Sequence, residues 1–481
     1  MILIMASSCN DILVEVPKNF ISAGNFYTNT KEVEDGLNGA YYTLWSQIDG
    51  NAWKNFHALQ TEYGTAAGSF ASVGNWDKPL QPDTYSRLNG FWLGFYRLID
   101  RANIILGKAP LVENINENTL KRILGEAHFL RAYAYFALVR YWGPVPIRTE
   151  QFTGASELAI PRAPRDQVYD LIIEDLLIAE QDCPEDVGNN TLRGSKWAAK
   201  IMLAEVYLNM EDWANAAVKA NEVIESDHYS LVSVEKPDDF YKIFAVTSTS
   251  SEEIWAFHFS LTILPTFMQW YHGVGTPYNR GVTYGFTNYP RMNSPFIVNW
   301  DKNDLRYDFN LYSSYNTAWP EEGGQIVNLT GVQSTRFKKY IKNPAGDALY
   351  NVPLYRLADA FLIFAEASCM AAGSPTTLGL ERLNIIKRRA YGFDPYSPNS
   401  IDYASGMSKD EFRDAVIKER GYEFFNEYSR WWDLKRTGKA KELIGAAVGK
   451  VVNDARLLFP LPLVEIETNP AIGPSNQNPG Y

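Results

Sequence analysis

Residues 118–146 read NTLKRILGEAHFLRAYAYFALVRYWGPVP, and their apolar residues recur with the period of an α-helix. These residues fall three or four positions apart and form one broad face: Leu120, Ile123, Leu124, Ala127, Leu130, Ala134, Ala137, Leu138 and Tyr141. Gly143-Pro144 stops the pattern, because proline cannot continue a helix. The stretch predicts one long amphipathic helix that packs against neighbouring helices.

The same period continues on both sides of this helix. Further helices are expected over residues 33–48, 88–107, 165–181, 195–210, 213–226, 354–372, 378–391 and 408–425. The helix over 213–226 carries a cluster of small residues that lets a neighbour approach closely, as in helical repeats: Ala214, Ala216, Ala217 and Ala220. We therefore predict a mainly α, helical-repeat frame over about residues 28–226 and 352–445.

Helical periodicity fades between these two parts of the frame. Residues 227–351 are rich in Gly, Pro, Asn and Tyr, as in HGVGTPYN at residues 272–279. This composition predicts a loop-rich insertion with short strands, and irregular chain of such length usually carries function. A smaller loop-rich stretch covers residues 61–86. No low-complexity tract separates the parts, so we expect one folded unit over residues 10–481.

Composition excludes several classes of partner. The chain has 481 residues with a formal net charge of -11 and no dense run of Lys and Arg. Nucleic acid is therefore not expected as a partner, because phosphate binding needs a basic surface. The chain also lacks a polybasic stretch that would bind an anionic membrane surface.

The three cysteines divide into two kinds. Cys183 and Cys369 lie in helical segments and are interpreted as buried free thiols. Cys9 follows the apolar stub MILIMASS at residues 1–8, which is typical of the end of a bacterial lipoprotein signal. The stub is shorter than a usual signal and has no basic start. We expect residues 1–9 to be a residual signal that ends in a lipid-anchor Cys9, and no segment is apolar enough to span a bilayer.

No catalytic or metal-binding pattern stands out. The five histidines are scattered, and the sequence lacks an H-E-x-x-H motif, a G-x-S-x-G elbow and a phosphate-binding glycine loop. Glycosidases need two opposed carboxylates, but the acidic pairs Glu252-Glu253 and Glu321-Glu322 are interpreted as solvated. We therefore predict no enzyme activity, no cofactor and no metal site.

Aromatic residues in the two loop-rich regions are the candidate ligand contacts. Trp and Tyr rings cover the apolar face of a sugar, while polar side chains bind its hydroxyl groups. Trp76, Trp270 and Trp319 lie beside Gly, Pro or polar residues, and we expect them to be exposed and to form one aromatic platform. The remaining candidate contacts are Tyr85, Tyr271, Tyr278, Arg280 and Tyr284. Trp300, which precedes Asp301-Lys302-Asn303-Asp304, is interpreted as structural and as preceding a strand.

Four segments, in this order, resemble the SusD/RagB family of nutrient-binding outer-membrane lipoproteins. They are residues 126–146; 357–367 with 383–390; 419–425 with 430–436; and the C-terminal pieces 459–462, 465–466, 469–470 and 477–481. CNDIL at residues 9–13 also resembles the mature start of the family. His128 and Gly421 are small departures from the family pattern. The resemblance covers essentially the whole chain.

This resemblance implies a SusD-like fold of four tetratricopeptide-like helix pairs with a more variable ligand-binding part. It implies an outward-facing position on the outer membrane, over a TonB-dependent transporter of the SusC type. The motif residues themselves are interpreted as structural, since Arg, carboxylate and aromatic side chains lock buried helix junctions. The terminal NPGY at residues 478–481 is expected to dock on the body of the protein.

The leading functional hypothesis is a binding protein that captures extracellular oligosaccharide or polysaccharide and delivers it to the transporter. A peptide or glycoprotein ligand is the alternative within the same family. A helical-repeat scaffold that binds only protein would not need an aromatic-rich insertion. A glycosidase lacks a recognisable catalytic constellation in this sequence.

Overall fold

The computed structural model describes residues 26–49, 57–154, 159–244, 249–259, 288–318, 323–331, 334–340 and 350–481. Its longer helices are α1 (Thr30–Asp49), α3 (Pro82–Lys108), α4 (Glu117–Trp142), α5 (Arg165–Asp182), α6 (Lys196–Asn209), α7 (Trp213–Ile224), α12 (Leu357–Ala372), α13 (Thr377–Ala390), α14 (Lys409–Glu423) and α16 (Ala440–Val448). Shorter helices are α8 (Tyr241–Phe244), α10 (Pro295–Val298), α11 (Leu305–Asn310), α15 (Arg430–Arg436) and α17 (Leu463–Thr468). The mainly α fold class is confirmed.

The long helix α4 is the centre of the frame. The side chain of Asn116 caps its first turn by accepting from the amides of Asn118 and Thr119, and Gly143 ends it at a φ of 75°. Nearly all of its second half is buried. Arg131 of α4 forms a two-pronged ion pair with the buried Asp175 of α5, with both N–O distances 2.8 Å. This pair fixes the angle between the two helices.

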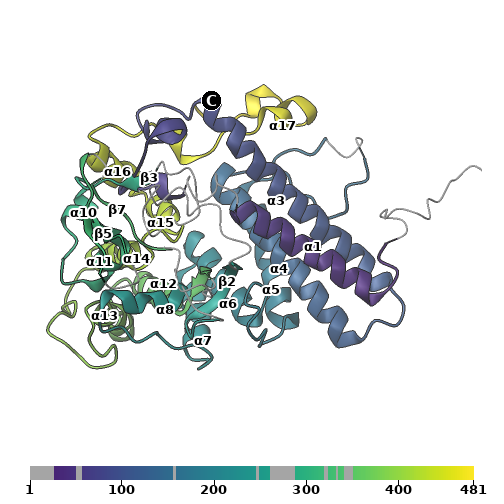
Figure 1. The fold of residues 1–481 in the computed structure, drawn as a ribbon. Coiled ribbons are helices and arrows are strands. Elements are labelled where there is room, and N and C mark those ends of the chain that lie inside the picture. The colour runs from purple at the N-terminus through teal and green to yellow at the C-terminus, as the bar shows by residue number, and fades with distance from the viewer. Residues whose placement is uncertain are drawn as a thin grey trace, which may run out of the picture.

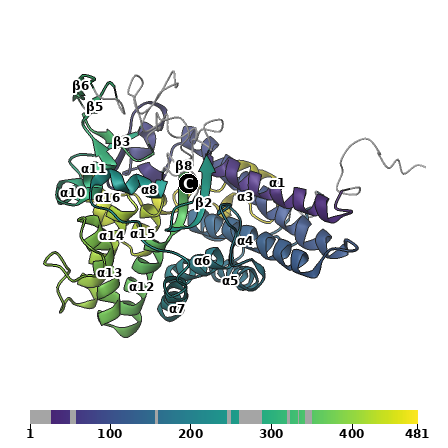
Figure 2. The ribbon, with the colours of Figure 1, turned by 60° about the horizontal axis from the view of Figure 1, so that its bottom comes forward.

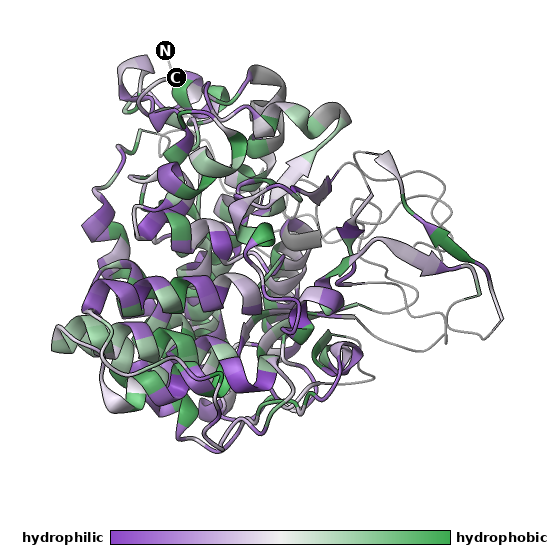
Figure 3. Ribbon diagram, turned by 90° about the vertical axis from the view of Figure 1, so that its left-hand side faces the viewer, coloured by the Kyte–Doolittle hydropathy of each residue, from purple (hydrophilic) through white to green (hydrophobic). Residues whose placement is uncertain are grey.

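Neighbouring helices pack in chain order, as in a helical repeat. Helix α3 packs on α4, α4 on α5, α5 on α6, and α6 on α7, after which α7 packs on α12 across the long insertion. Figures 1 and 2 both show α1, α3 and α4 side by side at one end of the molecule and α12 to α14 at the other. In Figure 3 most helices alternate hydrophilic and hydrophobic colours, as amphipathic helices do.

Two of the differences from the sequence-based element boundaries have a clear physical reason. The helix expected from residue 354 begins at Leu357, because residues 350–356 form strand β8, which pairs with β2. Helix α3 begins at Pro82, so the last residues of the expected loop 61–86 belong to a helix. Proline suits the first turn of a helix, where its missing N–H has no partner to lose.

The described part of the insertion combines the short helices α8, α10 and α11 with short antiparallel ribbons. Among the residues that the structure describes, the strands pair as β1 (Gly64–Ala66) with β3 (Asn288–Pro290), β2 (Glu253–Phe259) with β8 (Tyr350–Arg356), β4 (Leu311–Tyr312) with β7 (Arg336–Phe337), and β5 (Ser314–Asn316) with β6 (Ile326–Asn328). The β5–β6 ribbon lies at the edge of the molecule in Figure 2.

The C-terminal tail docks on the body, as predicted. The buried Asn478 donates to the carbonyls of Trp142, at 3.0 Å, and Phe459, at 2.7 Å. Its side-chain oxygen accepts from Arg162 at 2.7 Å, and the hydroxyl of Tyr481 donates to the carbonyl of Ala455 at 2.9 Å. The tail therefore ties the end of α4 to the C-terminal segments.

The prediction for the two helical cysteines is also confirmed. Cys183 and Cys369 are buried free thiols. Burial raises the pKa of both thiols above the ordinary value, which keeps them in the unreactive thiol form. Trp300 is buried as well, and its ring N–H donates to Asp304 at 3.0 Å. The structural interpretation of Trp300 is correct, but Asp304 caps the start of helix α11 and does not precede a strand.

Candidate ligand-binding face

The two loop-rich regions meet through one short ribbon. Strand β1 comes from the first region and β3 from the second, and their pairing sets Thr65 opposite Tyr289. The amide of Arg291 continues the connection by donating to the carbonyl of Tyr63 at 2.6 Å. We expected loops from the two regions to lie together, and this pairing confirms that part of the expectation. Tyr289 is half-buried, so part of its ring remains accessible at the junction.

A second ribbon closes the base of the insertion. Strands β2 and β8 pair from Glu253 with Arg356 to Phe259 with Tyr350. The chain therefore leaves the frame after residue 259 and returns to the same place at residue 350. Any loop between these residues is attached at both ends to a paired strand.

Buried ion pairs fasten this base to the frame. Arg356, at the end of β8, donates to Glu423 of α14 at 2.6 Å and to Glu252 at 3.2 Å. Arg389 of α13 pairs with the same two carboxylates. Burial alone would raise the pKa of Glu423, but Arg389, Arg356 and Arg306 hold it well below its ordinary value. The network fixes three elements at one buried point.

Glu252-Glu253 was interpreted as a solvated pair, and this interpretation is wrong. The two residues are 0% and 2% exposed. Glu252 pairs with two arginines, and Glu253 accepts from Asn351 and lies within 2.6 Å of a ring nitrogen of His258. Partners a hundred residues away in sequence make this burial possible. Glu321-Glu322 lies outside the described residues.

The first loop-rich region, residues 61–86, is held in place by the third family-like segment, residues 419–425 with 430–436. Arg430 of α15 pairs with Glu62, with one N–O distance of 2.9 Å, and also donates to the carbonyl of Ile417 at 2.7 Å. The hydroxyl of Tyr63 accepts from the amide of Asn426 at 3.1 Å. The structural interpretation of the family-like arginines is therefore confirmed for Arg430, because its ion pair with Glu62 holds the first loop-rich region against α15.

Trp76 does not belong to an exposed platform. Its ring is 0% exposed and lies between Trp431, at 5.9 Å between ring centres, and the guanidinium of Arg456, at 4.3 Å. The amide of Asn453 donates to its carbonyl at 2.8 Å. The C-terminal segment covers the ring, so the prediction of an exposed Trp76 is wrong.

The other candidate contacts are not placed by the structure. Tyr85 lies in the first turn of α3, and its side chain is not described. The remaining candidate contacts lie outside the described residues: Trp270, Tyr271, Tyr278, Arg280, Tyr284 and Trp319. Their sequence positions still tie them to the described ribbons, because residues 270–284 join β2 to β3 and Trp319 falls between β5 and β6. The predicted lipid-anchor residue, Cys9, also lies outside the described residues.

A cavity of about 320 Å³ lies beside the fastened first region. Its wall includes Phe296 and Tyr422, whose ring centres lie 4.8 Å apart, and its polar lining includes Asn299 and Lys418. Sequence analysis did not single out Phe296. The signal was present in Pro295-Phe296, an aromatic residue in the first turn of a short helix inside the insertion.

The described ranges contain neither a candidate metal-binding cluster nor a candidate membrane-spanning helix. No group of three or more His, Cys, Asp or Glu side chains there is arranged to hold a metal ion. No described helix combines the length and apolar character needed to cross a membrane.

Known protein families match both halves of the chain. A family model described as "Starch-binding associating with outer membrane" matches residues 23–208, and the SusD family model matches residues 259–481. The chain belongs to the SusD/RagB family. SusD-like protein P2 of Formosa agariphila is 27% identical over 521 residues, covering 100% of this chain and 98% of that protein.

Solved structures of SusD-like proteins share the fold. A SusD homologue from Bacteroides thetaiotaomicron has a TM-score of 0.77 at 22% identity, covering 95% of this chain and 98% of the other. A laminarin-binding SusD-like protein has a TM-score of 0.73 at 23% identity, covering 95% and 100%. At these identities, the two structures establish the fold of this SusD-like protein.

Proposed function

We propose that this SusD-like protein binds extracellular oligosaccharide or polysaccharide at the cell surface and delivers it to a SusC-type TonB-dependent transporter. The observation that supports the proposal most is the β1–β3 pairing, which joins two loop-rich regions on one face. Family membership and the laminarin-binding neighbour favour a glycan as the ligand. The protein acts as a binder and not as an enzyme.

The architecture suits ligand binding by loops whose ends are held in place by the helical frame. Buried ion pairs hold the ends of both regions, including Arg430 with Glu62 and Arg356 with Glu252. Loops held at both ends lose less freedom when a ligand binds, and this increases affinity. Aromatic side chains in the loops stack on sugar rings, while the transporter offers further contacts to the same ligand.

Trp270 and Trp319 are the first rings to test. Each Trp→Ala change is expected to weaken glycan binding by about 1–3 kcal/mol, because each removes a stacking surface from the ligand. Thermal stability is expected to change little. A glycan array identifies the ligand, and titration calorimetry then measures each variant. Tyr396→Ala is a suitable control, since Tyr396 is 61% exposed on the connection between α13 and α14.

Specific outcomes would contradict this proposal. Unchanged affinity in both variants would remove the two tryptophans from the site. Binding of a peptide library with no glycan binding would favour the peptide alternative. The same glycan samples are assayed for reducing ends, and turnover abolished by one Asp or Glu substitution would show that the protein is an enzyme.

Lipid attached to Cys9 is proposed as the membrane anchor. The motivation is Ser7-Ser8-Cys9, followed by the family-like start at residues 10–13. Wild-type protein in its native cell is expected to incorporate a palmitate analogue, and Cys9→Ala is expected to lose the label and leave the membrane fraction. Stable anchoring by lipid takes more than one acyl chain. Equal labelling of both proteins would refute the assignment.

A further inference from the structure

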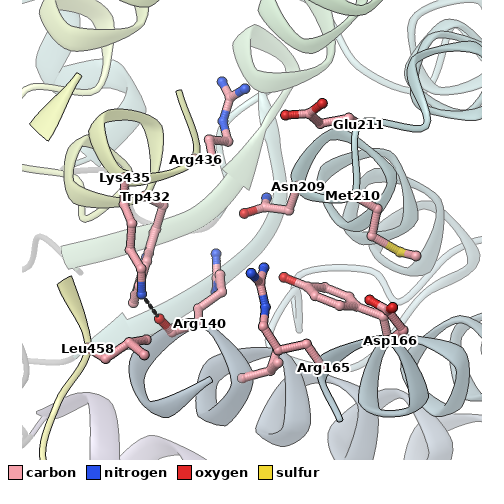
Figure 4. A pocket seen from close by; sticks show the side chains of 12 residues that line it. Arg140, Arg165, Asp166, Asn209, Met210, Glu211, Trp432, Lys435, Arg436 and Leu458 are labelled. Carbon is pink, nitrogen blue, oxygen red and sulfur yellow. Dashed lines mark hydrogen bonds between the residues drawn. The ribbon is translucent and has the colours of Figure 1, made fainter. Parts of the chain in front are cut away.

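A cavity of about 470 Å³ lies where α4, α5, α15 and the end of α6 meet (Figure 4). We call it the α4–α15 cavity, and none of its lining residues comes from the two loop-rich regions. It is separate from the face to which we assign glycan binding. Its charged and aromatic lining includes Arg140, Arg165, Asp166, Tyr169, Trp432 and Lys435.

Two arginines at this cavity have carboxylate partners. Arg140 pairs with Glu205 at 2.9 Å, and its guanidinium lies 3.7 Å from the ring centre of Phe136 and 4.6 Å from that of Trp432. Arg436 pairs with both Glu366 and Asp433. These arginines are explained by packing of the frame.

Lys435 is different. Its ammonium donates to the backbone carbonyl of Arg140, as the dashed line in Figure 4 marks. No carboxylate among the described residues lies within ion-pair distance of it, and the same holds for Arg165 at the cavity rim. A partly buried ammonium normally recruits a carboxylate, because leaving a charge unpaired costs free energy. Two cations without carboxylate partners therefore line one cavity.

The electrostatics agree with this geometry. Burial, followed by repulsion from Arg165 and Arg140, lowers the pKa of Lys435 to about 7. An anion in the cavity would oppose both effects, because pairing with it favours the charged form of the ammonium. The rim also carries the exposed carboxylates of Asp166 and Glu211, which disfavour a ligand with several negative charges.

We propose that the α4–α15 cavity binds a small ligand through a single carboxylate, which pairs with Lys435 and Arg165. The rest of the ligand packs against Met210 and Leu458, which supply apolar surface. The cavity volume of about 470 Å³ accommodates a molecule of monosaccharide or dipeptide size. Two kinds of ligand have a single carboxylate of this kind: a sugar acid and the C-terminus of a short peptide.

Titration calorimetry of the full chain with three probes tests the proposal. Glucuronate offers a sugar ring with a carboxylate, N-acetylalanine a carboxylate without a sugar, and glucose a sugar without a carboxylate. At least one of the two carboxylates is expected to bind, and glucose is expected not to. Binding of glucuronate alone identifies a sugar acid, binding of N-acetylalanine alone a peptide terminus, and equal binding a general carboxylate site.

Lys435→Met is the decisive variant, because methionine keeps an unbranched side chain of similar size and removes the charge. We expect at least tenfold weaker carboxylate binding and a normal melting temperature. Lys387→Met is the matched control, since Lys387 is also partly buried, has a lowered pKa and contacts an aromatic ring at 4.0 Å. Carboxylate binding should be unchanged in that control. If Lys435→Met does not fold, Arg165→Gln at the exposed rim is expected to weaken binding severalfold.

The pH profile supplies a second readout. The groups that face Lys435 are Arg140, Arg165, Arg436, Asp166, Glu211 and Tyr169. Carboxylates and guanidinium groups ordinarily keep one charge from about pH 6 to 9, and burial raises the pKa of Tyr169. Carboxylate affinity should therefore be highest near pH 6 and fall as Lys435 loses its proton above about pH 7.

Three results would overturn the proposal: glucose binding as tightly as glucuronate, no carboxylate binding at all, or wild-type carboxylate affinity and pH profile in Lys435→Met. Glycan binding at the loop-rich face should be unaffected by Lys435→Met. Failure of this proposal is thus distinguishable from failure of the proposed function.

Discussion

Replacing Glu423 by glutamine is expected to lower the free energy of unfolding by about 3–5 kcal/mol. Glu423 is 3% exposed and contacts Arg306, Arg356 and Arg389, which come from three different elements. Glutamine keeps the shape but removes the charge that these guanidinium groups face. The expected loss is therefore that of breaking a buried ion pair by removing one partner. Urea unfolding at neutral pH measures it.

The pH dependence of this effect has a definite sign. The folded-state pKa of Glu423 lies below the ordinary value of 4.5, so its contribution is fully present above about that pH. The contribution is lost as the pH falls further and the carboxyl group takes up a proton. The difference between wild type and Glu423→Gln should therefore shrink in acid.

Glu442→Gln provides the control for a surface carboxylate. Its side chain is 68% exposed, and its nearest cation, Lys439, lies 4.0 Å away. The change is expected to alter stability by no more than about 0.5 kcal/mol. A similar, small effect of Glu423→Gln would show that the buried network does not hold the insertion to the frame.

The helical frame could be predicted because its signals are local. Asn116 before the first turn of α4, Gly143 after its last turn and the apolar period between them specify a helix without reference to the rest of the chain. The same reasoning placed both ends of α1, α5, α6, α7, α13 and α14 within three residues. It began α3 six residues too late and did not predict α16. It placed the start of α12 three residues too early, because strand β8 depends on β2, a partner remote in sequence.

The candidate site was less predictable for a related reason. The helices must bury their own apolar faces, so the two loop-rich regions were expected to meet on the exposed side of the frame. The β1–β3 ribbon confirms this expectation. Which side chains are exposed depends on distant segments. Glu252 is buried because Arg356 and Arg389 lie beside it, and neither arginine is near it in sequence. The residues next to Glu252 in the sequence give no sign of these distant arginine partners.

The burial of Trp76 could not be predicted for the same reason, because the residues that cover it are distant in sequence. Trp76→Ala is expected to lower the free energy of unfolding by about 3–5 kcal/mol, the usual cost of deleting a large buried ring. Among the described residues the ring nitrogen of Trp76 has no hydrogen-bond partner, so the loss is one of packing against Trp431 and Arg456. Thermal melting and urea unfolding measure it.

Glycan titration then separates Trp76 from the loop tryptophans. At a temperature where Trp76→Ala remains folded, its affinity should equal that of wild type, because a covered ring has no face to offer a sugar. Trp76→Phe, which keeps an aromatic ring in the same space, should recover a large part of the lost stability. Trp270→Ala should show the opposite pattern, with normal melting and weaker binding. A Trp76→Ala protein that melts normally but binds weakly would mean that this ring becomes exposed to the ligand.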